Sequence, residues 1–256
     1  MFELLRKFSL LMLLFLVAMG TYLGAENSTD WREPLLVQVY PVNGDDRDFT
    51  NEYIDQLKEE DFDSIESFML NQAERYDVLM DRPVVLLLGE QIYELPPSPG
   101  KQPGLFDVMW WSLKFRWWAN DITADHVGPE ADIRLFLVYF DPEHHPTLSH
   151  SVGIQQGLIG IVNVFATTNQ AETNNFVIAH EMLHTLGATD KYDYAGNMPA
   201  FPDGYADPER YPLYPQPKAE IMGGRIPLSS NEAAIPEDLQ QVVVGPATAE
   251  EIRWLR

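Results

Sequence analysis

The chain has 256 residues, with 39 acidic and 17 basic side chains, a formal net charge of −22 and no cysteine. A charge of this sign repels nucleic acid and anionic membranes and disfavours acidic substrates, and the lack of cysteine excludes a disulfide framework. A packed hydrophobic core must therefore carry the stability, and the length suits one domain or two closely joined lobes.

The N-terminal segment predicts export. Arg6 and Lys7 precede an apolar run over residues 8–23, which is the layout of a secretory signal. Because the run is somewhat short for a membrane-spanning helix of about 20 residues, cleavage is favoured over an uncleaved anchor. Residues 1–25 are therefore expected to be a signal peptide or an N-terminal anchor. The protein is expected to be secreted or held in the cell envelope or periplasm, with membrane contact only through this segment.

Alternating or continuous apolar runs predict the strands of one sheet, over residues 35–40, 83–88, 133–140 and 158–165. Apolar side chains at helical spacing predict a long helix over residues 62–76. Residues 91–104 are rich in proline and glycine and predict a loop. The order of these segments predicts a catalytic lobe that contains both helices and strands.

Aromatic residues crowd the helix predicted around residues 110–118. Trp111, Phe115 and Trp118 share one face of it, and we expect this face to pack against the sheet rather than to bind a ligand by stacking. Three histidines between residues 144 and 150 follow a strand end in a proline-bounded loop. They are interpreted as solvated side chains rather than as a second metal site.

His180, Glu181 and His184 form an H-E-x-x-H motif, which Gly187 and Asp190 extend to H-E-x-x-H-x-x-G-x-x-D. Residues four apart lie on the same face of a helix, so both imidazoles can reach one metal ion. Glu181 is placed to hold a metal-bound water rather than to bind the metal. Gly187 is expected to end the helix in the left-handed conformation, and Asp190 follows as a candidate third ligand. The motif predicts a hydrolytic zinc site with an open fourth position.

The segments around the motif predict how its helix begins and how the chain ends. Thr or Asn within residues 167–169 can cap the N-terminus of the motif helix. Residues 188–246 carry many Pro, Gly, Tyr and Asp residues and little periodicity, which predicts an irregular segment. A short closing helix is expected over residues 248–255, with Thr248 as its N-cap.

The extended motif resembles the metzincin signature in its minority form with Asp as last ligand, as in the snapalysin-like proteases. Those families place a methionine turn under the metal, and here Met222 lies in a comparable context, Glu-Ile-Met-Gly-Gly. The resemblance covers residues 174–224, and it implies a zinc-dependent endopeptidase. The implied fold is α+β, with a mixed twisted sheet and an active-site helix followed by a smaller irregular C-terminal lobe. The implied subdomains are residues 26–187, which are catalytic, and residues 188–256, which supply Asp190 and Met222.

The same resemblance implies roles for the remaining groups. One zinc ion is held by His180, His184 and Asp190, while Glu181 acts as general base and Met222 supports the ligands from below without binding metal. In metzincin-like folds an edge strand pairs with an extended peptide substrate, and residues 149–156 are the expected edge. Eukaryotic secreted metalloproteases are usually disulfide-bonded, so the absence of cysteine favours a bacterial source.

Four alternatives stay open. Glu209 or Glu220 could replace Asp190 as third ligand. The chain could be a non-catalytic exported zinc-binding protein of the same fold, although an intact general base argues against that. It could also be a zinc amidase that acts on cell-wall peptides. Finally, acidic loops around residues 190–193 or 203–207 could bind calcium, although neither has the spacing of an EF-hand.

Overall fold

The computed structural model describes residues 29–98, 100, 104–124, 128–155, 157–193 and 195–255. The expected signal peptide or anchor, residues 1–25, lies outside the described residues. Within the part of the chain that is described, no helix combines the length and the apolar character that crossing a membrane requires.

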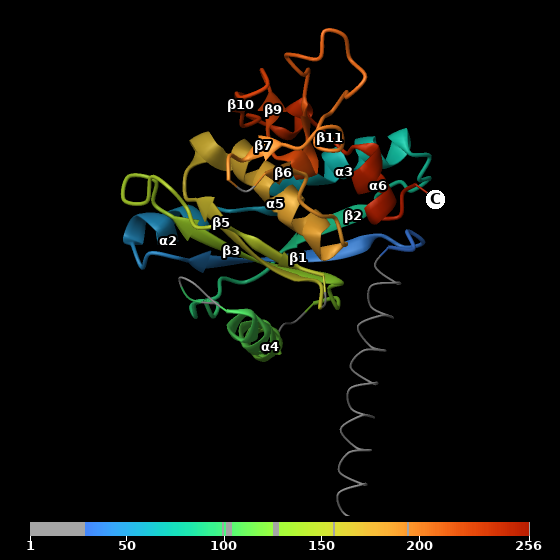
Figure 1. Cartoon of the computed structure of the whole chain (residues 1–256). Coiled ribbons are helices and arrows are strands. Elements are labelled where there is room, and N and C mark those ends of the chain that lie inside the picture. Colours follow the sequence, from blue (N-terminus) through green and yellow to red (C-terminus); the bar gives the residue numbers. More distant parts are fainter. Residues whose placement is uncertain are drawn as a thin grey trace, which may run out of the picture.

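A five-stranded sheet forms the centre of the molecule (Figure 1). Its strands are β1 (Leu35–Asn43), β2 (Val84–Leu88), β3 (Ile133–Phe140), β4 (Val152–Ile154) and β5 (Ile159–Phe165), in the spatial order β2-β1-β3-β5-β4. The four strands that the apolar runs predict are confirmed to within a few residues as β1, β2, β3 and β5. They pair in parallel, whereas β4 runs antiparallel to β5 and forms one edge of the sheet. The apolar runs of the parallel strands follow from burial on both faces.

Helices cover both faces of this sheet, and the fold is therefore mixed α and β. Figure 1 shows α3 (Asp63–Arg75), α5 (Ala171–Thr185) and the C-terminal α6 (Pro246–Glu251) on one face and α4 (Leu105–Ile122) on the other. The short α2 (Asp48–Ile54) follows β1. The long helix predicted before β2 is confirmed as α3, which the 3₁₀ turn η1 (Glu59–Phe62) precedes.

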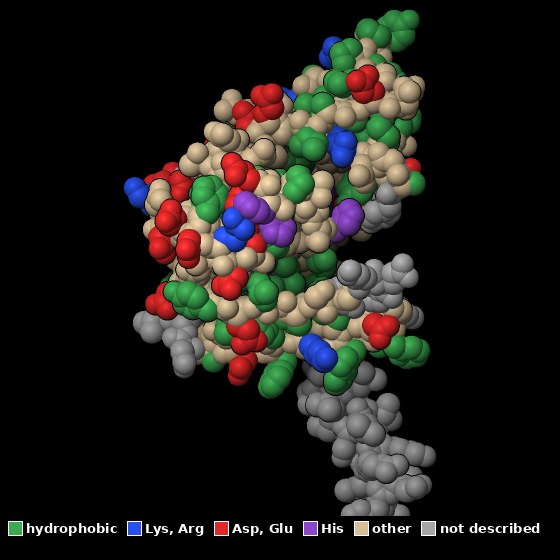
Figure 2. Space-filling model, turned by 90° about the vertical axis from the view of Figure 1, so that its left-hand side faces the viewer, with side chains coloured by type: hydrophobic (Ala, Val, Ile, Leu, Met, Phe, Trp, Pro, Cys, Tyr) green, Lys and Arg blue, Asp and Glu red, His purple; other side chains and the backbone are tan. Residues whose placement is uncertain are grey.

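The inward face of α4 packs as the sequence predicts. Trp111, Phe115 and Trp118 are buried, and the Trp118 ring meets Phe136 of β3 edge-on at 4.7 Å between centroids. The helix also carries exposed apolar side chains: Trp110 and five further large ones, namely Phe106, Val108, Met109, Leu113 and Trp117. Figure 2 shows hydrophobic side chains along the lower edge of the body, where α4 lies.

The C-terminal segment is irregular, as predicted, but it shares the main hydrophobic core with the sheet. It contains short strands and turns: β6 (Tyr192–Asp193), β7 (Met198–Pro199), β8 (Ala219–Glu220), η3 (Ile221–Gly223), β9 (Ile226–Pro227), β10 (Ala233–Ala234), η4 (Leu239–Gln241) and β11 (Val242–Val243). Met222, Val244 and Trp254 lie in the same buried cluster as Val37 of β1 and Ile178 of α5. This continuous core fixes the C-terminal segment against α5.

Two predicted helix caps are wrong. Residues 168 and 169 belong to a 3₁₀ turn, η2 (Thr168–Gln170), and the N-cap of α5 is Gln170, which makes no side-chain capping bond. The C-terminal helix begins at Pro246, after Gly245, because proline fixes the helical φ angle and its missing N–H costs nothing in the first turn. Thr248 is therefore a buried residue inside α6, and its hydroxyl donates to Glu220 instead of capping the helix.

Candidate metal centre

The motif lies on α5, which is buried on nearly every side. Phe176, Ile178, Met182 and Leu183 fix the helix in the main core, since all four are buried there. A helix with buried side chains on most of its faces lies in the interior of a protein. His180 and Glu181 are nevertheless buried as well, so their polar atoms need partners inside the molecule.

Three potential ligand atoms converge at one point beside α5. The Nε2 atoms of His180 and His184 lie 3.1 Å apart. Asp190 Oδ1 lies 3.2 Å from the first of these nitrogens and 3.1 Å from the second. The structure thus brings together the three residues that the sequence predicts as metal ligands.

Backbone carbonyls determine which nitrogen of each imidazole carries hydrogen. His180 Nδ1 lies 2.8 Å from the Ile221 carbonyl oxygen, and His184 Nδ1 lies 2.8 Å from the Ala188 carbonyl oxygen. A carbonyl can only accept, so each Nδ1 must donate, and the Nε2 of a neutral imidazole then carries a lone pair. Two nitrogen lone pairs and one carboxylate oxygen consequently face the same point, which is the arrangement that holds a metal cation.

Acidic groups favour positive charge at this point. Burial works to lower the pKa of His184, but the hydrogen bond to Asp190 and the charge of Glu181 outweigh it, so the pKa is raised. The carboxylates of Glu181 and Asp190 therefore favour a positive charge beside His184.

The Glu181 carboxylate lies within 4.8 Å of ligand nitrogens of His180 and His184, next to the point where the three atoms converge. Its side chain accepts a hydrogen bond from the backbone N–H of Gly153 in β4, and its Oε2 has no hydrogen-bond partner among the described residues. Burial raises the pKa of this carboxyl, while the charges of His180 and His184 oppose the shift. A buried carboxylate with one unused oxygen and a raised pKa is suited to accept a proton from a reacting water.

A Schellman turn carries the chain from α5 to Asp190. The N–H of Gly187 donates to the His184 carbonyl at 3.1 Å, and the N–H of Ala188 donates to the Leu183 carbonyl at 3.1 Å. Gly187 has a φ of 102°, so the predicted left-handed glycine after the helix is confirmed. The turn also brings the Ala188 carbonyl back to His184, and in this way one glycine helps to orient two ligands.

The segment for which the resemblance predicts a methionine turn forms the 3₁₀ turn η3, in which Met222 is fully buried. Its neighbour Ile221 supplies the carbonyl that orients His180. The carbonyl of Met222 itself accepts from the N–H of Lys191 at 2.8 Å, which ties the turn to the residue after Asp190. Sequence reasoning missed the Ile221 and Ala188 carbonyls, because any residue type can supply a carbonyl.

The alternative third ligands lie elsewhere. The Glu220 carboxylate is fully buried and accepts three hydrogen bonds, from Gly223 N, Gly245 N and Thr248 Oγ1. Glu209 is exposed. Replacement of Asp190 by Glu220 is therefore wrong, and the geometry places the Asp190 carboxylate beside the two imidazoles.

The other histidines and the acidic loops do not gather in the same way. His144 Nδ1 lies 2.8 Å from the Asp141 carboxylate, and His145 lies 3.9 Å from Asp45. Among the described residues, the His, Asp and Glu side chains that lie close enough to share a metal ion are those of His180, Glu181 and His184, and Asp190 joins the same two imidazoles. The two loops considered for calcium form no such group in that part of the chain.

Two hollows border the candidate site, one beside the segment that precedes β4 and the other beside β4 itself. One of 380 Å³ is lined by residues 148–151 and by His180 and Glu181, together with apolar side chains that include Phe176 and Ile235. The other, of 520 Å³, is lined by residues 152–155 and by His184 and Asp190, with Trp111 of α4. The edge segment that the sequence predicts at residues 149–156 therefore runs past the converging ligands, and Gln156 alone of it lies outside the described residues.

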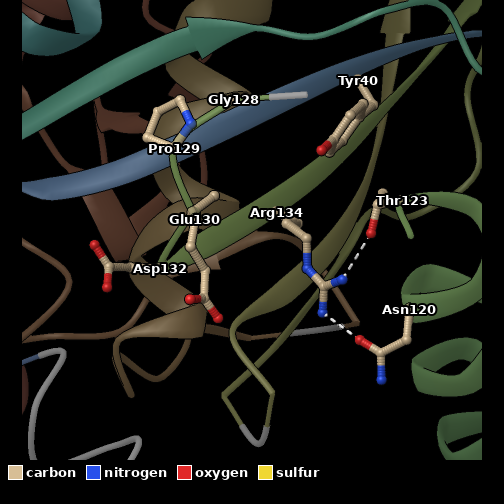
Figure 3. Close-up of a pocket in the computed structure, with 9 residues that line it drawn as sticks. Tyr40, Asn120, Thr123, Gly128, Pro129, Glu130, Asp132 and Arg134 are labelled. Carbon is tan, nitrogen blue, oxygen red and sulfur yellow. Dashed lines mark hydrogen bonds between the residues drawn. The ribbon is translucent and has the colours of Figure 1, made fainter. Parts of the chain in front are cut away.

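A further pocket of 390 Å³ lies between the end of α4 and the loop before β3 (Figure 3). Arg134 points into it and donates to Thr123 Oγ1 at 2.9 Å and to Asn120 Oδ1 at 2.8 Å. It also donates to the Ala119 carbonyl at 3.2 Å, so it satisfies the C-terminal end of α4. None of the motif residues lines this pocket, and we assign Arg134 a structural role.

Comparison with known proteins suggests no function for this chain. The chain matches no protein-family model, and no curated protein is significantly similar to it in sequence. Function is therefore inferred from α5, the turn that follows it, and the hollows beside them.

Proposed function

We propose that the chain is a zinc-dependent endopeptidase of the metzincin type, exported from the cell. The observation that carries this proposal is the convergence of His180 Nε2, His184 Nε2 and Asp190 Oδ1 within 3.2 Å of one another. The Schellman turn at Gly187 and the buried turn at Met222 support the same type, because both orient the ligands.

The donor set fits zinc better than calcium or magnesium. Zinc bonds of 2.0–2.1 Å in tetrahedral geometry place the ligand atoms about 3.3 Å apart. The three observed separations of 3.1, 3.1 and 3.2 Å are close to that value. Calcium and magnesium prefer oxygen ligands and a higher coordination number, whereas two imidazoles with one carboxylate suit zinc and leave a fourth position open.

Different residues of the chain have different roles in the proposed hydrolysis. Zinc held there would polarise the scissile carbonyl and make a water molecule more acidic. Glu181 accepts the proton of the attacking water on its carboxylate and delivers it to the leaving nitrogen. The Gly153 N–H holds the other oxygen of Glu181 in place, and the two backbone carbonyls hold the imidazoles.

A peptide in extended conformation suits the surroundings of the site. The edge strand β4 has a neighbour on one side only, so its outer backbone groups can pair with a substrate strand. Hollows on both sides of the ligands give the peptide room before and after the scissile bond, which favours cleavage within a chain. The hollow beside Glu181 has walls formed by Phe165, Phe176 and Ile235, and we expect it to take an apolar side chain.

The test is cleavage of a denatured protein, such as casein, by the purified chain with and without a chelator. Chelator-sensitive cleavage that Glu181→Gln abolishes would support the proposal, and Glu172→Gln, an exposed glutamate on the same helix, is the matched control. Purified wall peptide provides the parallel substrate: cleavage of wall peptide alone would favour the amidase. Zinc binding with neither activity would favour the non-catalytic binding protein.

A further inference from the structure

The C-terminal helix α6 holds the loop that carries Asp190. The Glu251 carboxylate at the end of this helix accepts from both donors of Thr189, from the backbone N–H at 2.9 Å and from the hydroxyl at 2.6 Å. It also accepts from Lys191 Nζ at 2.7 Å. One carboxylate thus binds the residue before Asp190 and the residue after it.

Lys191 makes this connection rigid. Its side chain is 6% exposed, and besides Glu251 it donates to the Thr189 carbonyl at 3.0 Å. Removing Glu251 would leave the buried charge of Lys191 without its carboxylate partner, which favours keeping the two side chains together. The three-residue segment 189–191 is consequently closed into a small ring by Glu251 and Lys191.

The first turn of α6 is joined to the other supporting segment of the site. The Glu220 carboxylate accepts from Gly245 N at 3.0 Å and from Thr248 Oγ1 at 2.7 Å, and its second oxygen accepts from Gly223 N at 2.8 Å. Glu220 directly precedes the turn whose Ile221 carbonyl orients His180. The helix is therefore fixed at its start to the methionine turn and at its end to the Asp190 loop.

Asp190 is the ligand that most needs such a support. His180 and His184 lie on a buried helix, whereas Asp190 lies three residues beyond Gly187, on a segment without regular structure. We propose that Glu251 is a positioning residue that acts through Asp190: by binding Thr189 and Lys191 it keeps the Asp190 carboxylate at the point where the two imidazoles meet. This inference rests on the proposed zinc site. Glu251 contacts neither imidazole and is not itself a ligand.

The experiment is a double-mutant cycle in which the zinc affinity of the full chain is measured by competition with a chromophoric chelator. Glu251→Gln keeps the size of the side chain but removes the charge that Lys191 and Thr189 bind. We expect it to weaken zinc binding about 10- to 100-fold, the range for groups that orient metal ligands. Glu250→Gln, an identical change at the exposed neighbouring residue of α6, should leave the affinity within about twofold.

The decisive comparison is made in the Asp190→Ala background. If Glu251 acts through Asp190, Glu251→Gln should change zinc affinity there by less than about twofold, because the group that it positions is absent. An equal loss in both backgrounds would mean that Glu251 supports the fold in general, and it would overturn the inference. The absorption spectrum of the cobalt(II)-substituted protein gives a second readout, since Glu251→Gln should move it toward that of Asp190→Ala, and an unchanged spectrum would contradict the inference.

Two controls separate the possible failures. Wild-type protein that binds no zinc would overturn the proposed function and this inference with it, whereas zinc binding that is equal in Glu251→Gln and Glu250→Gln would overturn the inference alone. If Glu251→Gln does not fold, Thr189→Val carries the same cycle, because Thr189 is exposed and its hydroxyl makes one of the three bonds to Glu251.

Discussion

Substitution of Gly153 by alanine tests how closely β4, the proposed substrate-binding edge, approaches α5. A Cβ at this position would lie 2.5 Å from the Glu181 carbonyl oxygen and 2.6 Å from the His184 Cβ. Both atoms belong to the rigid part of α5, so neither can rotate away. Reaching 3.4 Å, where ordinary contact begins, requires a separation greater by about 0.9 Å. The strand must therefore move away from the helix.

Two effects follow from a displacement of this size. Overpacking of this kind lowers the free energy of unfolding by about 1–3 kcal/mol. A shift of about 1 Å in a group that positions the substrate or the general base lowers the rate by about 100-fold. The Gly153 N–H also donates a hydrogen bond to Glu181. A displacement of β4 therefore disturbs both the substrate-binding edge and the general base.

The assays are urea denaturation of the metal-free protein and casein hydrolysis of the zinc-loaded protein. Gly196→Ala is the matched control, since the nearest atom to its new Cβ is 3.6 Å away, and it should resemble the wild type in both assays. A Gly153→Ala protein with wild-type stability and wild-type turnover would refute the close approach of β4 to α5.

Three further outcomes are expected. Gly187→Ala should lower the free energy of unfolding by about 1–3 kcal/mol, as measured by thermal denaturation. The φ of 102° at residue 187 is strained for alanine, and the new Cβ would meet the Gln155 side chain. Met222→Ala should cost about 2–5 kcal/mol by opening a cavity in the main core, whereas Met222→Leu should cost less than about 1.5 kcal/mol, and equal effects in denaturant titrations would contradict this. Burial alone would raise the pKa of Glu251, but hydrogen bonds from Lys191 and Thr189 outweigh it and hold the pKa below its ordinary value of 4.5. The stability that Glu251 contributes is therefore present above about pH 4.5 and is lost as the pH falls toward the lowered pKa. The difference in unfolding free energy between metal-free wild type and Glu251→Gln should shrink over that range. A difference that grows as the pH falls would contradict the lowered pKa.

Local signals in the sequence predict much of the sheet and part of the site. The strands and α3 follow from apolar runs and helical spacing, and the left-handed glycine at Gly187 follows from its place after the motif. His180, His184 and Asp190 could be selected because the spacing within one helix and one turn decides whether they meet. These features depend on residues close to one another in the chain.

Features that depend on distant segments could not be predicted. Thr248 looks like a helix cap in the sequence, but Pro246 begins the helix earlier and a buried Glu220 from another segment takes the threonine hydroxyl. The roles of Glu251 and Lys191 arise only when the C-terminal helix lies beside the Asp190 loop, 60 residues earlier in the chain. Charged side chains of this kind resemble surface residues until their partners are known.

The most direct test of the proposed zinc site is the zinc content of the purified protein, measured by elemental mass spectrometry after dialysis against buffered zinc. We predict one zinc ion per chain in the wild type, weaker binding in Asp190→Ala, and full retention in Glu181→Gln, because we propose Glu181 as the general base and Asp190 as the third ligand. Wild-type protein without zinc, or Asp190→Ala protein that binds it as tightly as the wild type, would contradict the proposed site.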